Sequence, residues 1–145
     1  MSEDAVRLAG SGDLPAIVAL CDQLGYPAVE EQVRQRLQQI EQNEDHAVYV
    51  VERPGVGVVG WVHVYVRPML IVGDQAEIGG LVVDESCRRS GVGLLLLARA
   101  ERWARERDHS GITVRSNAVR EGAHAFYRDA GYGEVKVQRV FRKAW

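Results

Sequence analysis

The pattern of hydrophobic and polar positions changes period several times, and each change marks the boundary of an expected element. Near the start, an apolar alternation predicts a short strand over residues 5–9. Apolar residues three or four positions apart then predict helices over 14–24 and 29–42. The polar segment 10–13 supplies candidate helix caps, and Pro15 suits a first helical turn. The first third therefore predicts a strand followed by two helices.

The middle of the chain has the pattern of an antiparallel meander. Segments rich in valine, separated by turn residues, predict strands over 47–52, 58–66 and 75–84. Gly79 and Gly80 interrupt the third of these strands. Paired glycines in a strand are typical of a bulge or of a close approach to the backbone. Three consecutive strands are expected here, with an irregularity in the last.

The last third alternates between helical and strand periods. A helix is expected over 92–107, and its Leu94–Leu97 run is apolar all round and so expected to be buried. A strand over 111–116, a helix over 121–130 and a final strand region over 132–143 follow. The predicted order is β-α-α-β-β-β-α-β-α-β. This order predicts an α/β (α+β) domain spanning 1–145, with helices on both faces of a mixed sheet.

Composition narrows the function classes. The chain has 145 residues, of which 46% are hydrophobic and 26% charged, as expected of one globular domain. The net charge of −2 and the pI near 6.1 argue against a nucleic-acid partner. The longest aliphatic run is too short for a membrane span, and the acidic start does not resemble a signal peptide. Two cysteines without paired spacing predict neither a disulfide framework nor a zinc site. We therefore expect a cytoplasmic protein.

One segment carries most of the chemical information. A valine-rich strand ends, a short loop rich in glycine and arginine follows, and a helix begins. The first turn of a helix offers unpaired N–H groups and the positive end of the helix dipole, which together attract anions. The glycines alone favour an ordinary helix start, and Arg88 and Arg89 add positive charge nearby. The segment in question consists of Arg88, Arg89, Ser90, Gly91, Val92 and Gly93.

The R-x-x-G-x-G pattern from Arg88 to Gly93 resembles the coenzyme A-binding loop of the GNAT superfamily of acetyl-CoA-dependent N-acetyltransferases. A second block, Ser116–Tyr132, is similar to that family's N-x(n)-A-x-x-F-Y-x-x-x-G-[FY] signature, most of all in its aminoalkylphosphonate and small-amine branch. The resemblance implies a GNAT acetyltransferase fold, acetyl-CoA as cosubstrate, and contacts from the loop amides to the pyrophosphate. It also implies that the pantetheine arm pairs like an added strand with Leu81, Val82 and Val83.

Three further residues have candidate roles. The resemblance implies that Tyr127 is the general acid that protonates the leaving thiolate, and we favour this role over the alternative, a tyrosine that packs the last helix. It also implies that Asn117 hydrogen-bonds the pantetheine arm, with a turn or cap as the alternative. Glu77 is a candidate general base or an exposed strand carboxylate. Strand alternation would place Glu77 on the same face as Leu81 and Val83.

Other reactive residue types have structural explanations. His63 and His124 have no second ligand at a metal-binding spacing, so no metal site is expected. Cys87 stands beside two arginines and a helix start, which would lower a thiol pKa. No Cys-His pair accompanies it, and the family reaction is usually direct attack, so an acetyl-cysteine intermediate is not expected.

The expected function is acetyl transfer from acetyl-CoA to the primary amine of a small molecule. The resemblance, through the architecture of the family, implies that residues such as Tyr26 and the Arg67–Asp74 loop line the acceptor pocket. The alternatives are a protein lysine or N-terminal acetyltransferase and a non-catalytic acyl-CoA-binding module. A homodimer is also possible, because the 135–145 stretch carries Phe141 and Trp145.

Overall fold

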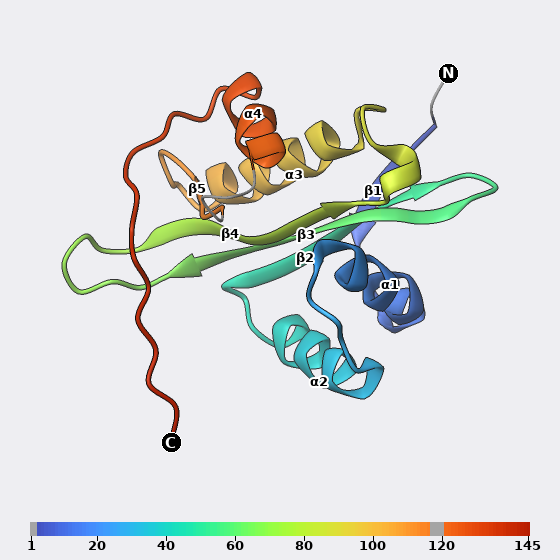
Figure 1. Ribbon diagram of the computed structural model, residues 1–145, viewed down its shortest axis with the longest axis horizontal. Coiled ribbons are helices and arrows are strands. Elements are labelled where there is room, and N and C mark those ends of the chain that lie inside the picture. The colour runs from blue at the N-terminus through green and yellow to red at the C-terminus, as the bar shows by residue number, and fades with distance from the viewer. Residues whose placement is uncertain (1–2, 117–120) are drawn as a thin grey trace. The chain divides into compact units, whose positions relative to one another are not determined.

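The computed structural model describes residues 3–116 and 121–145. The chain divides into two compact units, Met1–Val114 and Arg115–Trp145. Among the described residues, the first unit contains a five-stranded sheet and three α-helices, and the second contains one α-helix (Figure 1). The elements in chain order are β1 (Ala5–Leu8), η1 (Ser11–Asp13), α1 (Leu14–Leu24), α2 (Glu30–Glu41), β2 (His46–Arg53), β3 (Gly57–Arg67), β4 (Gln75–Val83), η2 (Glu85–Cys87), α3 (Val92–Glu106), β5 (Thr113–Val114) and α4 (Glu121–Asp129).

The sheet has the order β1-β2-β3-β4-β5. The first four strands are antiparallel neighbours, and β5 runs parallel to β4 after the α3 crossover. Parallel neighbours need such a crossover, whereas antiparallel neighbours are joined by turns. The predicted mixed sheet and fold class are therefore confirmed.

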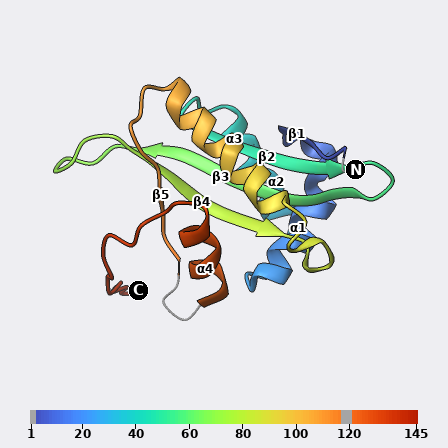
Figure 2. The same cartoon turned by 90° about the horizontal axis from the view of Figure 1, so that it is seen from above.

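Helices cover both faces of this sheet, as Figures 1 and 2 show. On one face, Leu14 and Ile17 of α1 and Leu37 of α2 form a buried cluster with Val48 and Val50 of β2. On the other face α3 lies against β3. A methyl group built on Gly60 of β3 would lie 3.1 Å from side-chain carbons of both Val92 and Leu96. Glycine at position 60 therefore lets the α3 helix approach the sheet closely.

Local sequence signals explain most of the helix boundaries. Pro15 stands in the first turn of α1, and Gly25 ends this helix in the left-handed conformation at φ 92°. The leucine run of α3 is only half buried: Leu96 and Leu97 are enclosed, but Leu94 and Leu95 are exposed. The prediction that the whole run is buried is wrong, because four consecutive helical residues span more than one face.

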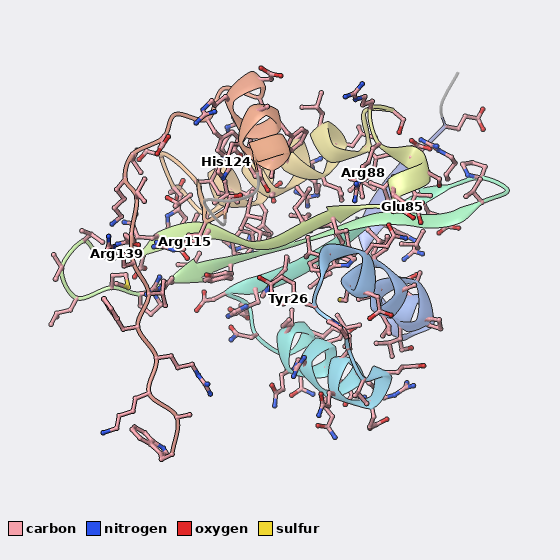
Figure 3. All side chains as sticks on the ribbon, viewed as in Figure 1. Tyr26, Glu85, Arg88, Arg115, His124 and Arg139 are labelled. Carbon is pink, nitrogen blue, oxygen red and sulfur yellow. The ribbon has the colours of Figure 1, made fainter. Side chains whose placement is uncertain are left out.

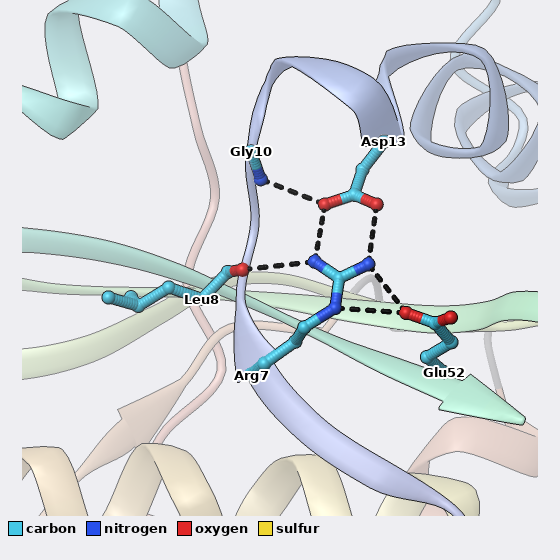
Figure 4. Close-up of polar contacts among 5 residues, drawn as sticks. All are labelled: Arg7, Leu8, Gly10, Asp13 and Glu52. Carbon is cyan, nitrogen blue, oxygen red and sulfur yellow. Dashed lines mark hydrogen bonds and ion pairs between the residues drawn. The ribbon is translucent and has the colours of Figure 1, made fainter.

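An ion pair joins β1 to the start of α1. The guanidinium of Arg7 donates to both carboxylate oxygens of Asp13 at 2.8 Å and also to Glu52 of β2 (Figure 4). Asp13 also accepts a hydrogen bond from the Gly10 backbone N–H. Asp13 is buried, and the hydrogen bonds from Arg7 lower the pKa of its carboxyl group below the ordinary value.

The predicted strand over 132–143 is wrong. The structure assigns no strand or helix to residues 133–145. A strand is defined by its pairing with a neighbour, and hydrophobic alternation alone does not create one. Five large apolar side chains of this segment are exposed: Val135, Val137, Val140, Phe141 and Trp145.

Candidate functional site

The loop between β4 and α3 is a compact turn that ends in a left-handed residue. Asp84 closes the η2 turn by accepting a hydrogen bond from the Ser86 N–H at 2.9 Å. Gly91 then adopts φ 89° and starts α3, a conformation that glycine adopts at little cost. Val92, the next residue, is 1% exposed and anchors the helix start in the core. Figure 3 shows Arg88 on this loop.

The start of α3 is open to an anion. No side chain in the described ranges caps it at Gly91, so the first backbone N–H groups of the helix have no capping acceptor. A methyl group built on Gly91 would meet no atom within 4 Å, so there is space above the backbone here. Arg88, Arg89 and Ser90 are exposed beside this space. The arrangement has the amides, the dipole and the cations that a pyrophosphate requires.

Arg53 at the end of β2 supports this loop, a role that the sequence does not reveal. Its guanidinium donates to the Ser90 hydroxyl at 3.3 Å and to the Cys87 sulfur at 3.5 Å. Asp4 accepts two hydrogen bonds from the same guanidinium at 2.9 Å and so orients it. The Ser90 hydroxyl in turn donates to the carbonyl of Cys87. The buried Cys87 is therefore part of the loop's framework.

Gln23 of α1 holds the other end of the loop. Its side-chain nitrogen donates to Asp84 at 3.1 Å, and its side-chain oxygen accepts from the Glu85 N–H at 2.9 Å. Hydrogen bonds from Ser86 and Gln23 lower the pKa of the Asp84 carboxyl group. The loop is thus connected to both β2 and α1.

Next to the loop, β4 has an open edge. Within the described chain, β5 pairs with β4 only at Glu77 and Ile78. Beyond Ile78, the part of β4 that contains Leu81, Val82 and Val83 has β3 as its sole partner strand among the described residues. Such an edge presents backbone N–H and C=O groups that an extended ligand can pair with. The predicted pantetheine-binding residues therefore lie along an open strand edge that leads to the anion loop.

A bulge in β4 changes the orientation of Glu77. His63 pairs with Gly80, but the next residue of β3, Val64, pairs with Ile78, which leaves Gly79 without a partner. The extra residue reverses the alternation, so Glu77 and Leu81 point to opposite faces. The prediction that Glu77 shares a face with Leu81 and Val83 is therefore wrong, whereas the predicted bulge is confirmed.

The two glycines of β4 make room for aromatic side chains of β3. A methyl group on Gly79 would lie 2.9 Å from Cε1 of Tyr65, and one on Gly80 would lie 2.8 Å from the Trp61 ring. These distances are shorter than any normal carbon contact. The rings of Trp61 and Tyr65 thus cover the β4 backbone. The close approach to the backbone that the glycine pair predicts is therefore made by side chains of the neighbouring strand β3.

Glu77 lies in a polar cluster on this face. Its side chain is 3% exposed. The Tyr65 hydroxyl donates to Oε2 of Glu77 at 2.7 Å, and Nη1 of Arg67 lies 3.5 Å from Oε1. Nδ1 of His46 and Nε2 of His63 are 3.0 Å apart, and the His46 ring stacks on Tyr65. Burial, with a smaller contribution from His46, lowers the pKa of His63 to about 4, so this imidazole is neutral at pH 7.

Tyr127 lies in α4, in the second unit. Its ring contacts Phe126 edge-on at a centroid distance of 5.3 Å and Tyr132 at 5.8 Å. The Tyr132 N–H donates to the Tyr127 carbonyl at 2.9 Å and closes the end of the helix. Asn117, the other site residue predicted in this part of the chain, lies outside the described residues.

A pocket of about 980 Å³ lies at the C-terminal end of α3 and the start of β2. His46 lines this pocket and also contacts the polar cluster around Glu77. The lining carries an excess of carboxylates, which favours cationic ligands. The acidic residues in the lining are Glu41, Glu44, Asp45, Asp74 and Glu106.

In residues 3–116 and 121–145 there is no group of three or more His, Cys, Asp or Glu side chains that could hold a metal ion. Of the helices in these ranges, none has the length and apolar character needed to cross a membrane. Cys21 and Cys87 are both free thiols.

The sequence matches the model of a known protein family and is similar to a curated relative. The model of the acetyltransferase (GNAT) family matches residues 16–132. An aminoglycoside N(6')-acetyltransferase type 1 of Klebsiella aerogenes is 34% identical over 103 residues. That match covers 67% of this chain and 66% of the relative, so the chain spans slightly less than two thirds of the relative's length.

Solved structures share the fold. An aminoglycoside N-acetyltransferase in complex with CoA has a TM-score of 0.88 at 19% identity, over 99% of this chain and 96% of its own. The same enzyme in complex with a bisubstrate analogue, CoA-S-monomethyl-acetylneamine, also has a TM-score of 0.88 at 19% identity, over 99% of this chain and 100% of its own. At this identity the likeness concerns the fold.

Proposed function

Because this chain belongs to the acetyltransferase (GNAT) family, we propose that it transfers the acetyl group of acetyl-CoA to the primary amine of a small molecule. The family predicted from the two sequence blocks is the one whose model matches. The observation that carries the proposal is the uncapped, left-handed start of α3 at the end of the open β4 edge. A phosphate-bearing cosubstrate with an extended arm fits such a site.

The residues present fit CoA in their chemistry. Backbone amides of the segment from Arg88 to Gly93 would hold the pyrophosphate, with Arg88 and Arg89 as nearby cations. The backbone of Leu81, Val82 and Val83 would pair with the pantetheine arm. Asn117 would add a hydrogen bond to the same arm. Acetyl-CoA supplies the thioester on which the reaction depends.

The proposed reaction is direct transfer. A proton of the acceptor ammonium passes to the Glu77 carboxylate, and the neutral amine nitrogen attacks the thioester carbonyl carbon. Backbone N–H groups of β4 stabilise the developing oxyanion. The C–S bond breaks, and Tyr127 donates its phenolic proton to the departing thiolate. The nitrogen then loses its second proton to solvent, which leaves the amide product, and the Tyr127 phenolate takes a proton back from solvent. A bisubstrate analogue that joins CoA to an amine binds the structurally similar aminoglycoside enzyme, which supports a direct mechanism.

The acceptor is proposed to be cationic. The pocket beside His46 carries five carboxylates, and these would attract an acceptor with more than one ammonium group. The relative from Klebsiella aerogenes is named for an aminoglycoside acceptor, a class with several amines. Aminoglycosides and polyamines are therefore the first acceptors to test. A lysine side chain or a protein N-terminus remains the second candidate class.

Location and assembly are also parts of the proposal. Two free cysteines suit a reducing compartment such as the cytoplasm. The exposed apolar side chains of the 135–145 stretch, including Phe141 and Trp145, support a homodimer. Light scattering at micromolar concentration would reveal that dimer, and a monomer would exclude it.

The test of function is an acetyl-transfer screen with release of CoA as the readout. Aminoglycosides, polyamines, an amino sugar and its phosphate ester would be compared with a lysine peptide. We expect turnover with a cationic amine, and we expect Glu77→Gln to lower kcat by about 10²–10⁴-fold with that acceptor. Binding of acetyl-CoA without turnover on any amine would instead favour a non-catalytic module.

A further inference from the structure

The Glu77 carboxylate is positioned by a side chain that the proposed reaction does not use. Tyr65 lies opposite Glu77 in the β3–β4 register, and its hydroxyl donates to Oε2 at 2.7 Å. This distance is typical of a strong hydrogen bond to an ionised acceptor. The Tyr65 ring packs close to the β4 backbone, since a methyl group built on Gly79 would lie 2.9 Å from its Cε1 atom. Stacking on His46, with ring centroids 5.3 Å apart, limits its movement in another direction.

Glu77 needs a hydrogen-bond donor such as Tyr65 to favour its charged form. Its side chain is 3% exposed, and burial by itself would raise the pKa of a carboxyl group and leave it protonated more often. A hydrogen bond to the charged form has the opposite effect. Arg67 also favours the charged form, but its side chain is 42% exposed and 3.5 Å away, so solvent weakens its influence.

Two histidines lie on the same face as Tyr65. His63 on β3 is neutral because burial lowers its pKa to about 4. His46 on β2 stacks on Tyr65 and contacts His63, so the Tyr65 ring separates it from the carboxylate. On the β5 side, the residue paired with Glu77 is Thr113, which does not titrate. Of the two side chains described in contact with the carboxylate, Tyr65 at 2.7 Å is closer than Arg67 at 3.5 Å.

We propose that Tyr65 is a positioning residue that fixes the Glu77 carboxylate through Oε2 and keeps it ionised, so that it can accept the proton of the acceptor ammonium. This inference rests on the proposed role of Glu77 as general base. In the proton-transfer step, one proton moves from the ammonium nitrogen to the carboxylate. Tyr65 keeps its own proton and returns to the same hydrogen bond when Glu77 releases the proton to solvent.

Tyr65→Phe tests this directly, because it keeps the stacked ring and removes only the hydroxyl. The acidic limb of the kcat/KM profile reports the pKa of the essential base in the free enzyme. We expect this limb to move up by about one to two pH units, as follows from the loss of a hydrogen bond to a charged group. The acceptor KM at high pH should change little. A limb within about 0.3 pH units of wild type would overturn the proposal.

Two controls separate this inference from the proposed function. Tyr132→Phe removes a tyrosine hydroxyl in the second unit and should leave the limb unchanged; an equal shift there would overturn the specific role of Tyr65. The second readout is a ¹³C NMR titration of the Glu77 carboxyl in protein labelled at glutamate. A higher Glu77 pKa in Tyr65→Phe without any change in the rate profile would support the positioning contact but refute Glu77 as the base. An unchanged Glu77 pKa would overturn the role of Tyr65 alone.

Discussion

The loop before α3 and the polar cluster around Glu77 are built from different parts of the chain. In the loop, the groups offered to a ligand are backbone amides, and their positions follow from one left-handed glycine and a buried valine next to it. In the cluster, they are side chains of β2, β3 and β4 that strand register brings together. A backbone site suits an invariant cosubstrate, whereas a side-chain site can be adapted to one acceptor. We therefore expect changes in the loop to affect binding of acetyl-CoA, and changes in the cluster to affect proton transfer.

The largest expected effect separates chemistry from binding. Tyr127→Phe keeps the ring contacts with Phe126 and Tyr132 and removes the hydroxyl. If Tyr127 protonates the thiolate, kcat should fall by about 10²–10⁴-fold while the acetyl-CoA Kd hardly changes. Single-turnover acetyl transfer and calorimetry measure the two quantities. Tyr132→Phe is the matched control, and a Tyr127→Phe rate within about threefold of wild type would rule out the acid role.

The second-largest effect is expected on binding of acetyl-CoA, in contrast to Tyr127→Phe, which should change the rate. Gly91→Glu places a negative charge where the pyrophosphate is proposed to bind, so the acetyl-CoA Kd should rise by about a hundredfold or more. Any residue other than glycine is strained at φ 89°, so Gly91→Ala is needed to measure the strain alone. We expect Gly91→Ala to weaken binding much less. Equal losses in the two variants would show that the conformation, and not the anion, explains the effect.

These two regions also differ in how well they could be predicted. The loop was predictable because its signal is contiguous: strand, glycine and arginine, then helix within a few positions. The composition of the cluster was not predictable, because the single-residue bulge at Gly79 reverses the strand alternation and moves Glu77 to the other face of the sheet. Support for the loop from Arg53 was also hidden, since Arg53 and Ser90 are 37 positions apart.

Most helices and strands could be predicted from the period of the hydrophobic pattern, because the residues that define them also lie close together in the sequence. Helix starts and ends depend on local residues such as Pro15 and Gly25, and the meander strands have neighbours close in the sequence. The segment 132–143 was predicted as a strand from its alternation, but alternation carries no information about whether a partner strand is paired with it. The structure assigns no strand there.

A smaller effect tests whether the loop depends on its support. Arg53→Gln removes the charged anchor to Asp4 and shortens the reach to Ser90 and Cys87. The acetyl-CoA Kd should rise by about three- to tenfold, because the amides are less well pre-organised. Calorimetry gives the Kd, and the pH profile should keep its acidic limb. A shifted limb would mean that the two regions are coupled.

The smallest effect on function is expected outside both regions. Asp13→Asn weakens the Arg7 pair and should lower the free energy of unfolding at pH 7 by about 1–3 kcal/mol. The folded-state pKa of Asp13 is depressed, so its contribution is present above the ordinary pKa of 3.8 and is lost as pH falls through the folded value. Urea unfolding at pH 7 and pH 3 should therefore show a smaller difference between variant and wild type at pH 3. The acetyl-CoA Kd should not change.

The most direct test of the central claim is a calorimetric titration of the wild-type protein with acetyl-CoA. We expect saturable binding with one site per chain, accompanied by thermal stabilisation of about 2.7 kcal/mol at a hundredfold excess of ligand over Kd. Gly91→Glu should remove both signals. A wild-type protein that releases no heat of binding and gains no stability would contradict the assignment of the β4 edge and the α3 start as an acetyl-CoA site.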